Sequence, residues 1–258
     1  MAAPPLFHDT FLPMNQESPS PRPDHPPAAP WSRRLLATAA CTLAACGGGG
    51  SLPDAPRITG KLPDTGITAD QCHGTDSAAF VSCTDAAALA FNAQQDGMTG
   101  LDVTDADHSD GKAGFSYSAL AGHDLSECVK DNITGLVWEG KSATRASARH
   151  GADRYTHYGD HRSGDASAYV RAVNASGLCG FSDWRLPTQQ ELQGLIDYGV
   201  EAPGVRIDQD WFAHTQGNWY WSAPAYANDV TMAWGVHFGL GTVEPLDRAS
   251  AAHVRLVR

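Results

Sequence analysis

Apolar residues recur at helical spacing in the C-terminal half of the chain. Ala166, Tyr169, Val170 and Val173 repeat with the spacing of one helix face. This spacing places them on one face of a helix, which we expect to be buried and to end near Gly177.

A second helix is predicted to begin at Thr188. Thr188 and Glu191 form a capping-box pattern, in which each side chain bonds a free backbone N–H of the first turn. Gly199 is typical of a C-terminal cap. The apolar stripe expected to face inward consists of Leu192, Leu195 and Ile196.

Short apolar and aromatic segments bounded by turn residues predict strands. They lie at 135–139, after a turn at 131–132, and near 219–223, 232–238, 242–245 and 253–257, with a turn at 239–241. Six of the seven tryptophans fall between Trp138 and Trp234, so we place the core in this region, with Trp221 and Trp234 inside it. The predicted fold class is α+β, with two helices packed on short antiparallel strands and stapled by disulfides.

The N-terminal region has the layout of an export signal. Arg33 and Arg34 precede an apolar run at 35–45, which is too short to cross a bilayer as a helix, and Cys46 is followed by four glycines. The sequence Leu-Ala-Ala-Cys at 43–46 resembles the lipobox of bacterial lipoproteins, which implies lipidation of Cys46 and anchoring to a membrane. A plain signal peptide with an incidental cysteine is the alternative.

By the same resemblance, Gly47 lacks the aspartate that retains lipoproteins at the inner membrane, which favours the outer membrane of a Gram-negative bacterium. The region before the signal is long for a leader, and Met14 is an alternative start.

Changes in composition divide the chain into four parts. We expect a leader with the lipoprotein signal at 1–45, a Gly/Pro-rich tether at 46–65, an Asp/Gly-rich segment with two cysteines at 66–113, and the main domain at 114–258. Thr84 and Asp85 could cap a short helix through Leu89 and Phe91.

The acidic balance of the chain limits its partners. The net charge is −11, and removal of the leader leaves it unchanged because the leader holds three basic and three acidic residues. An acidic surface argues against nucleic acid and against polyanions as general partners.

Four cysteines remain beyond the leader and Cys46. An even number in an exported chain predicts two disulfides. Three pairings are possible, and we favour Cys72–Cys83 as a local staple and Cys128–Cys179 as a longer link. A zinc site is the competing interpretation, which the lack of any CxxC pair disfavours.

Two segments carry possible metal ligands. Closely spaced carboxylates in a glycine-containing loop can bind calcium, although the spacing is not that of an EF-hand, and a solvated acidic loop is the alternative. These carboxylates belong to Asp102, Asp105, Asp107 and Asp110. His150, His157 and His161 form a weaker candidate, since nearby glycines predict a loop and not a helix. No other cofactor is expected.

Aromatic residues near loops are candidates for ligand binding. Trp219 and Tyr226 flank predicted loops, and Tyr155 and Tyr158 lie in a polar, aromatic one. Exposed aromatic rings stack on ligands, although core packing explains most aromatics. We expect any binding surface in the loops 142–165, 200–218 and 224–231.

Five segments together resemble the Lcl C-terminal domain family, over roughly residues 115–258. They are DNITGLVWEGK at 131–141, AYVRAVNASGLCGFSDWRLPTQQEL at 168–192, YWSA at 220–223, AWGVHF at 233–238 and VRLVR at 254–258. Family members are exported bacterial proteins, often lipoproteins. The Arg-Leu-Pro-Thr helix start and the Arg-Leu-Val-Arg end also resemble the C-type-lectin-like fold of formylglycine-generating enzymes.

These resemblances imply a non-catalytic surface or periplasm-facing lipoprotein that binds a glycan, a matrix component or another adhesion ligand. An envelope assembly module with a protein partner is the alternative. A lectin-fold oxidase is less favoured, because it needs a cysteine pair late in the domain and the last cysteine is Cys179. No GxSxG element suggests a serine nucleophile.

Overall fold

The computed structural model describes residues 62–75, 79–104 and 109–258. Cys46, the leader and most of the predicted tether lie outside these residues. The described part contains no helix with the length and apolarity that crossing a bilayer requires.

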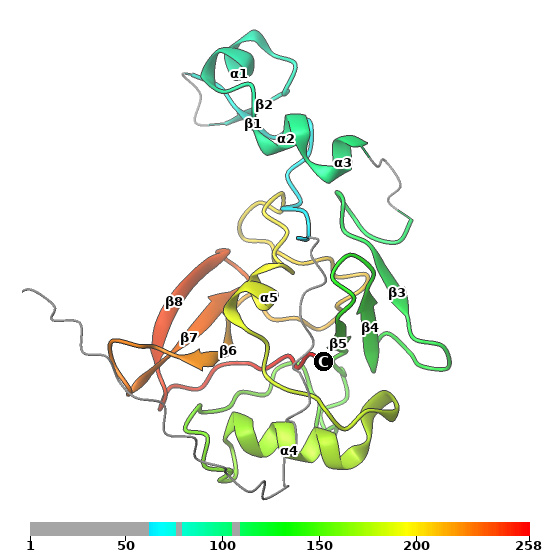
Figure 1. Cartoon of the computed structure of the whole chain (residues 1–258), viewed down its shortest axis with the longest axis vertical. Helices are drawn as coiled ribbons and strands as arrows, with labels where there is room; N and C mark the ends of the chain where they lie inside the picture. Colours follow the sequence, from blue (N-terminus) through cyan, green and yellow to red (C-terminus); the bar gives the residue numbers. More distant parts are fainter. Residues whose placement is uncertain (1–61, 76–78, 105–108) are drawn as a thin grey trace, which may run out of the picture. The chain divides into compact units, whose positions relative to one another are not determined.

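The first sheet is antiparallel and has three strands. β3 (Tyr117–Ala119), β4 (Cys128–Asp131) and β5 (Val137–Glu139) follow one another in order (Figure 1). The predicted turn after Asp131 is present, because the Asp131 carboxylate accepts hydrogen bonds from the backbone N–H groups of Ile133 and Thr134 at 2.9 and 3.1 Å.

The second sheet separates two hydrophobic cores. It consists of β6 (Trp219–Ala225), β7 (Met232–His237) and β8 (Thr242–Asp247), again antiparallel and in order. Because strand side chains alternate, Tyr220 enters one core and Trp221 enters the other.

Trp234 was expected in the core and is only half-buried. It lies near the outer end of β7, where its ring meets that of Tyr226 edge-on at 5.1 Å. The prediction was wrong because the alternation of side chains along a strand shows which face of the sheet a residue lies on. It does not show whether other elements cover that face at the position of the residue.

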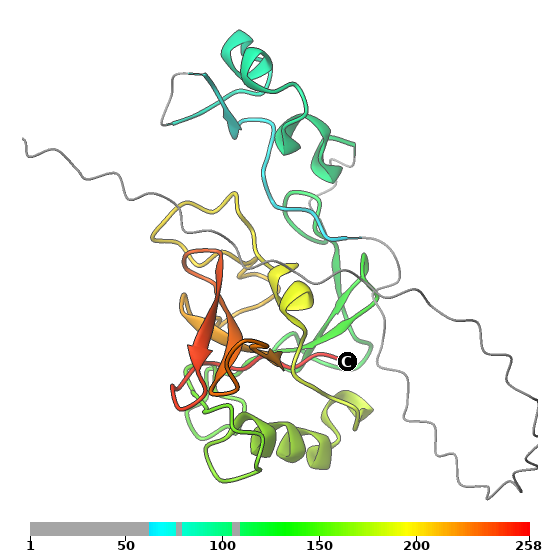
Figure 2. The same cartoon turned by 60° about the vertical axis from the view of Figure 1, so that its left-hand side comes forward.

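The longer predicted helix is confirmed as α4 (Ala166–Ser176). Asp165 caps its first turn, and Gly177 ends it with a φ of 63°. Its inward residues Ala166, Tyr169 and Val173 pack in the core that contains Trp221. Figures 1 and 2 show α4 below the strands of both large sheets. A 3-10 turn, η1 (Leu178–Gly180), follows directly.

The second helix, α5 (Gln189–Gln193), has the predicted capping box but ends earlier than expected. Gly194, not Gly199, is its C-terminal cap. Beyond it the chain turns, and Asp197 N–H donates to the carbonyl of Arg206 at 3.1 Å. Leu195 and Ile196, which belong to the predicted apolar stripe, are buried as expected. The prediction of their burial is confirmed, but the helix is shorter than predicted.

The segment 62–104 contains only short elements. They are β1 (Cys72–His73), β2 (Phe80–Val81), α1 (Ala86–Phe91), α2 (Asp96–Thr99) and α3 (Leu101–Thr104). α1 confirms the predicted short helix, with Asp85 as its cap. We call residues 62–104 the small module.

The last seven residues connect the two large sheets. They were expected to form a strand near 253–257, but they make isolated bridges to several partners instead. Trp221 N–H donates to the carbonyl of His253 at 2.9 Å, and Val137 N–H donates to that of Arg258 at 3.0 Å. In Figures 1 and 2 the red C-terminal segment runs from β6 to β5.

Both favoured disulfides are present. Cys72–Cys83 closes the small module, and Cys128–Cys179 joins β4 to η1. The structure therefore shows the predicted class of fold: short helices on short antiparallel sheets, with two disulfides.

Four buried polar side chains hold the C-terminal segment in place. The Glu139 carboxylate accepts hydrogen bonds from Lys141 Nζ at 2.9 Å, from the Tyr169 hydroxyl, and from Leu256 N–H at 3.0 Å. Arg255 donates to the Glu139 carbonyl at 2.6 Å. Burial lowers the pKa of Lys141 to about 8, although the Glu139 carboxylate opposes this shift.

We expect Glu139→Gln to destabilise the fold by about 3–5 kcal/mol, because it leaves the buried ammonium of Lys141 without its carboxylate. Chemical unfolding followed by tryptophan fluorescence measures this loss. Glu244→Gln, on the exposed side of β8, is the matched control and should change stability by less than about 0.5 kcal/mol. If the two substitutions lowered the free energy of unfolding equally, the hydrogen bonds of the Glu139 carboxylate would not be a particular source of stability.

Candidate functional site

The small module is attached to the segment that follows α5. Tyr198 N–H donates to the carbonyl of Thr65 at 2.8 Å, and Gln71 Nε2 donates to that of Gly199 at 2.7 Å. Gly66 has a φ of 77°, and a Cβ at this position would collide with the Asp197 carboxylate. The close approach of the two chains therefore requires glycine at position 66.

Asp197 is the buried polar group against which Gly66 packs. Its buried carboxylate accepts hydrogen bonds from Lys112 Nζ at 3.2 Å and from Gly199 N–H at 2.9 Å. Burial raises the pKa of Asp197, while the ammonium of Lys112 and these hydrogen bonds oppose the rise. The segment that receives the small module is thus held by a carboxylate that is costly to bury and whose partners, Lys112 and Gly199, lie outside the module.

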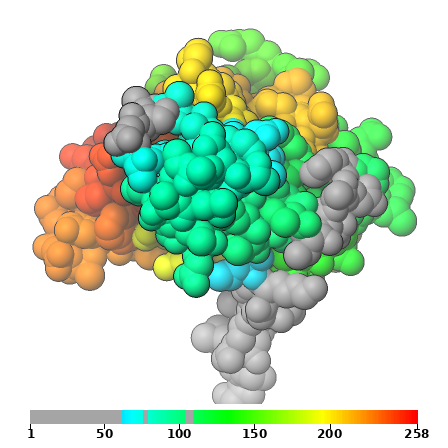
Figure 3. All heavy atoms as spheres, turned by 90° about the horizontal axis from the view of Figure 1, so that it is seen from above, coloured from blue at the N-terminus to red at the C-terminus, as the bar shows by residue number. Residues whose placement is uncertain are grey.

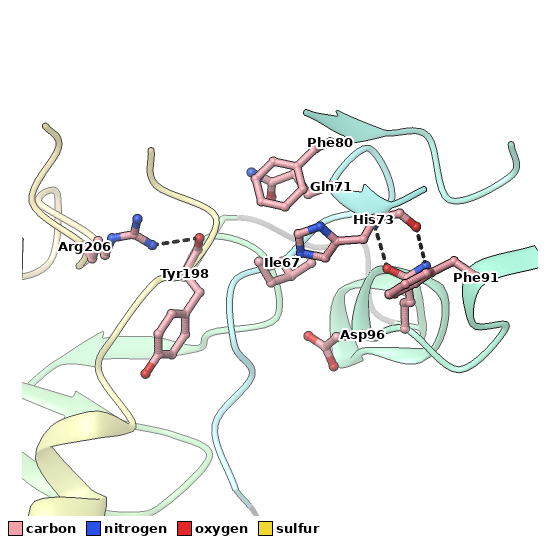
Figure 4. Close-up of a pocket in the computed structure, with 9 residues that line it drawn as sticks. Ile67, Gln71, His73, Phe80, Phe91, Asp96, Tyr198 and Arg206 are labelled. Atoms are coloured by element: carbon pink, nitrogen blue, oxygen red, sulfur yellow. Dashed lines mark hydrogen bonds between the residues drawn. The ribbon is translucent and has the colours of Figure 1, made fainter. Parts of the chain in front are cut away.

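A groove of about 470 Å³ lies between the small module and this segment (Figure 4). Aromatic rings and planar polar groups line it together. Its lining residues are Ile67, Gln71, His73, Phe80, Phe91, Gln95, Asp96, Tyr198 and Arg206. Viewed from above, the blue-green surface of the small module lies against the yellow segment that follows α5 (Figure 3).

The apolar part of the groove includes exposed rings. Phe80 is 37% exposed and Phe91 is 57% exposed. The imidazole of His73 packs against Phe80 with 5.1 Å between ring centroids. Exposed aromatic rings beside a groove are the side chains that most often anchor a ligand.

The polar part of the groove is held by its own hydrogen bonds. Gln95 accepts from His73 N–H at 2.7 Å and donates to the His73 carbonyl at 2.9 Å, which fixes β1 against α2. Asp96 accepts from the Thr65 hydroxyl. Arg206 donates through Nη1 to the Tyr198 carbonyl at 3.2 Å, while its buried Nε has no partner in the described part of the chain. A ligand here would meet apolar ring faces, one carboxylate and one guanidinium.

None of the four aromatic residues singled out from the sequence lines this groove. Trp219 is half-buried against His237, with ring centroids 4.8 Å apart. Tyr226 packs on Trp234, and Tyr155 packs on Tyr169 at 4.8 Å.

Tyr158 is 39% exposed and has the guanidinium of Arg162 over its ring at 4.5 Å. The structure does not gather these four residues into one site, and a ligand role for them stays a prediction.

Hydrogen bonds of Arg248 nevertheless link two of the three predicted binding loops, 142–165 and 224–231. Arg248 donates to the carbonyls of His157 and Tyr158 at 2.6 and 2.7 Å, and to that of Val230 at 3.1 Å. The buried Asp165 accepts from Tyr158 N–H at 2.6 Å. Burial raises the pKa of Asp165, but hydrogen bonds from Ser167, Tyr158 and Thr156 outweigh it and hold the pKa at about 2.

The structure provides no test of the predicted calcium ligands as a set. Asp105 and Asp107 lie outside the described residues. Asp110 accepts from the Ser116 hydroxyl at 2.6 Å, and burial raises the pKa of Asp102. Within the described ranges no three His, Cys, Asp or Glu side chains are placed to hold a metal ion.

The histidines of the polar loop also have separate surroundings. His157 is buried, with Nε2 3.0 Å from the carbonyl of Ser222, and burial lowers its pKa. His150 lies 3.5 Å from Asp153, and His161 adopts a left-handed φ of 60°. The loop geometry therefore agrees with the glycine pattern and not with a helix that would align these side chains.

Sequence reasoning missed most of the groove. Phe80 and Phe91 lie in a segment of weak periodicity, and Arg206 lies in a loop. The available signal was two phenylalanines in a polar, disulfide-closed segment too small to bury them. Only Arg206 belongs to a predicted binding loop, 200–218.

The fold defines an α+β domain with two disulfides, closed by its own C-terminal segment. A model of the Lcl C-terminal domain matches residues 127–258, about half of the chain, and the chain belongs to this family of exported bacterial domains. No curated protein matches the chain. The groove thus combines family residues such as Tyr198 with residues of the small module, which lies outside the match.

We expect Asp197→Ala to disorder the segment to which the small module is attached, because Lys112 Nζ and Gly199 N–H lose their acceptor and Gly66 loses the side chain it packs against. The expected cost is about 1–3 kcal/mol. Hydrogen exchange should accelerate at Tyr198 N–H while the amides of β6 and β7 stay protected. Asp229→Ala, which removes an exposed aspartate that caps a turn between those strands, is the control. Unchanged exchange at Tyr198 would contradict this assignment of Asp197.

Proposed function

We propose that this protein is a lipoprotein, anchored through Cys46 and non-catalytic, whose folded part binds an extracellular saccharide in the groove. Membership of an exported bacterial family supports the location, and the lipobox-like sequence supports the anchor. The outer membrane is the favoured destination because Gly47 follows the cysteine.

The observation that carries the ligand class is the pairing of exposed rings with fixed polar groups. Phe80 and Phe91 offer apolar faces on which the C–H face of a sugar ring can stack. Asp96 offers a hydrogen-bond acceptor to hydroxyl groups, and Arg206 offers donors. A saccharide presents both kinds of surface on one ring.

The overall charge narrows the ligand further. A net charge of −11 repels highly sulfated polymers, so neutral or weakly acidic sugars are favoured. The guanidinium of Arg206 can receive a single carboxylate, as in a uronic acid.

Glycan-array binding by the full chain carrying Cys46→Ser tests this proposal. We expect binding to neutral or uronic-acid glycans, weakened tenfold or more by Phe91→Ala because a stacking face is lost. Leu240→Ala, which removes an exposed apolar side chain that does not line the groove, should leave binding unchanged. Failure to bind any glycan or matrix component would refute the saccharide proposal.

A protein partner in the envelope is the second candidate. The small module also exposes Leu89, Leu101 and Val103, which lie outside the groove lining and exceed what a sugar needs. Stoichiometric recovery of one envelope protein with the full chain, lost on Leu89→Ser but not on Phe91→Ala, would favour this assembly role.

Oxidase chemistry of the formylglycine-generating kind has less support. Cys128 and Cys179 form a disulfide between β4 and η1, so this pair serves to link two elements of the domain. Non-catalytic binding is therefore our proposal. Bound metal in the purified protein that disappears with Cys128→Ser would contradict it.

Lipidation is tested separately from ligand binding. We expect the wild-type chain to partition with membranes and to gain the mass of attached acyl chains at Cys46. Cys46→Ser should release the protein in soluble, unacylated form, because the thiol is the acceptor. Cys41→Ser, five residues upstream, is the control and should remain acylated. Acylation that persists in Cys46→Ser would show the assignment to be wrong.

A further inference from the structure

A second cleft of about 470 Å³ shares no lining residue with the groove. It is lined by Ser109, Lys112, Leu125, Asp208, Asp210 and Trp211. Two of these side chains are apolar, one is a cation and two are carboxylates, so the cleft differs in chemistry from the mainly apolar groove.

The indole of Trp211 is held in place from the core side. It is half-buried, packs against the larger hydrophobic core, and lies 6.0 Å from the ring of Tyr117. Leu125 packs against the same core. The cleft therefore has an apolar wall that needs little reorganisation to receive a ligand.

A turn fixes the two carboxylates beside this wall. The Asp208 carboxylate accepts from Asp210 N–H at 3.0 Å, and the Asp208 carbonyl accepts from Phe212 N–H at 2.8 Å. Asp208, Asp210 and Trp211 are thus presented together by four consecutive residues.

The single cation of the cleft is already paired. Lys112 Nζ lies 3.2 Å from the Asp197 carboxylate, which is buried. The charge of Lys112 is therefore balanced within the protein, and Asp208 and Asp210 leave the cleft negative. The negative charge of Asp208 also affects a neighbouring residue. The pKa of Tyr117 is raised first by burial and then by the carboxylates of Asp131, Asp208 and Asp197.

We propose that this cleft binds an organic cation, namely an alkylammonium group whose carbon chain lies against Trp211 and Leu125 and whose charge faces Asp208 and Asp210. Ammonium groups are attracted both to carboxylates and to the face of an indole ring. The net charge of −11 adds a long-range attraction for cations.

Such a group can belong to a free diamine or to a lysine side chain of another protein. The shared chemistry is a primary ammonium on an alkyl chain. This inference is independent of saccharide binding, because the two sites have no lining residue in common.

Calorimetric titration of the full chain carrying Cys46→Ser tests the proposal with three probes. Cadaverine represents the free diamine, Nα-acetyl-lysine methylamide represents a lysine side chain, and 1-pentanol is the uncharged analogue. We expect one or both amines to bind and pentanol not to bind. The better amine identifies the source. Equal binding of pentanol, or binding of neither amine, overturns the proposal.

Paired variants locate the site. Asp208→Asn with Asp210→Asn should weaken amine binding about tenfold or more, and Trp211→Leu should weaken it while retaining the carboxylates. Glu201→Gln, an exposed carboxylate of the same loop that does not line the cleft, should leave it unchanged. Circular dichroism of each variant checks folding, and if Trp211→Leu is unfolded, the double aspartate variant decides alone.

These assays distinguish a failure of the amine proposal from a failure of the saccharide proposal. Phe91→Ala should leave amine affinity unchanged, and the double aspartate variant should leave glycan binding unchanged. Loss of amine binding in Phe91→Ala, or full amine binding in the double aspartate variant, would overturn the assignment to this cleft.

Discussion

The buried carboxylate of Glu139 is the interaction on which the domain depends. It accepts hydrogen bonds from Lys141, Tyr169 and the backbone of Leu256 at once, while the backbone carbonyl of Glu139 accepts from Arg255. Each charge would be costly to bury alone, so the four groups are stable only as a set. Their combined effect is to fix the C-terminal segment between two sheets that do not pair directly with one another.

The same logic recurs where the small module meets the family domain. The module has a tiny core made of its disulfide, Ala88 and a few partly buried residues, so it cannot bury its own aromatic rings. The hydrogen bonds of Thr65 and Gln71 attach it to the segment that follows α5, where Gly66 packs against the buried Asp197. The exposed rings of Phe80 and Phe91 therefore line the groove. The small size of the module's core thus leaves apolar surface on which a ligand can bind.

The structure contains two clefts of different chemistry that share no lining residue. The groove combines exposed rings with Asp96 and Arg206, which suits a saccharide, while the cleft at Trp211 combines an indole with two carboxylates, which suits an ammonium group. Both use residues from outside the family match together with residues from inside it. The two proposed sites therefore draw on residues N-terminal to the family match as well as on the shared domain.

The sequence by itself determined the local features: α4 with its end at Gly177, the capping box at Thr188 and the turn at Asp131. These follow from spacing and from hydrogen bonds between near neighbours, which a linear pattern contains. Tertiary structure alone decided that α5 stops at Gly194, that Trp234 stays half-exposed, that residues 252–258 bridge two sheets, and that Phe91 and Arg206 share a groove. Each of these outcomes depends on which distant segment covers or pairs with the residue, and side-chain periodicity carries no information about that choice.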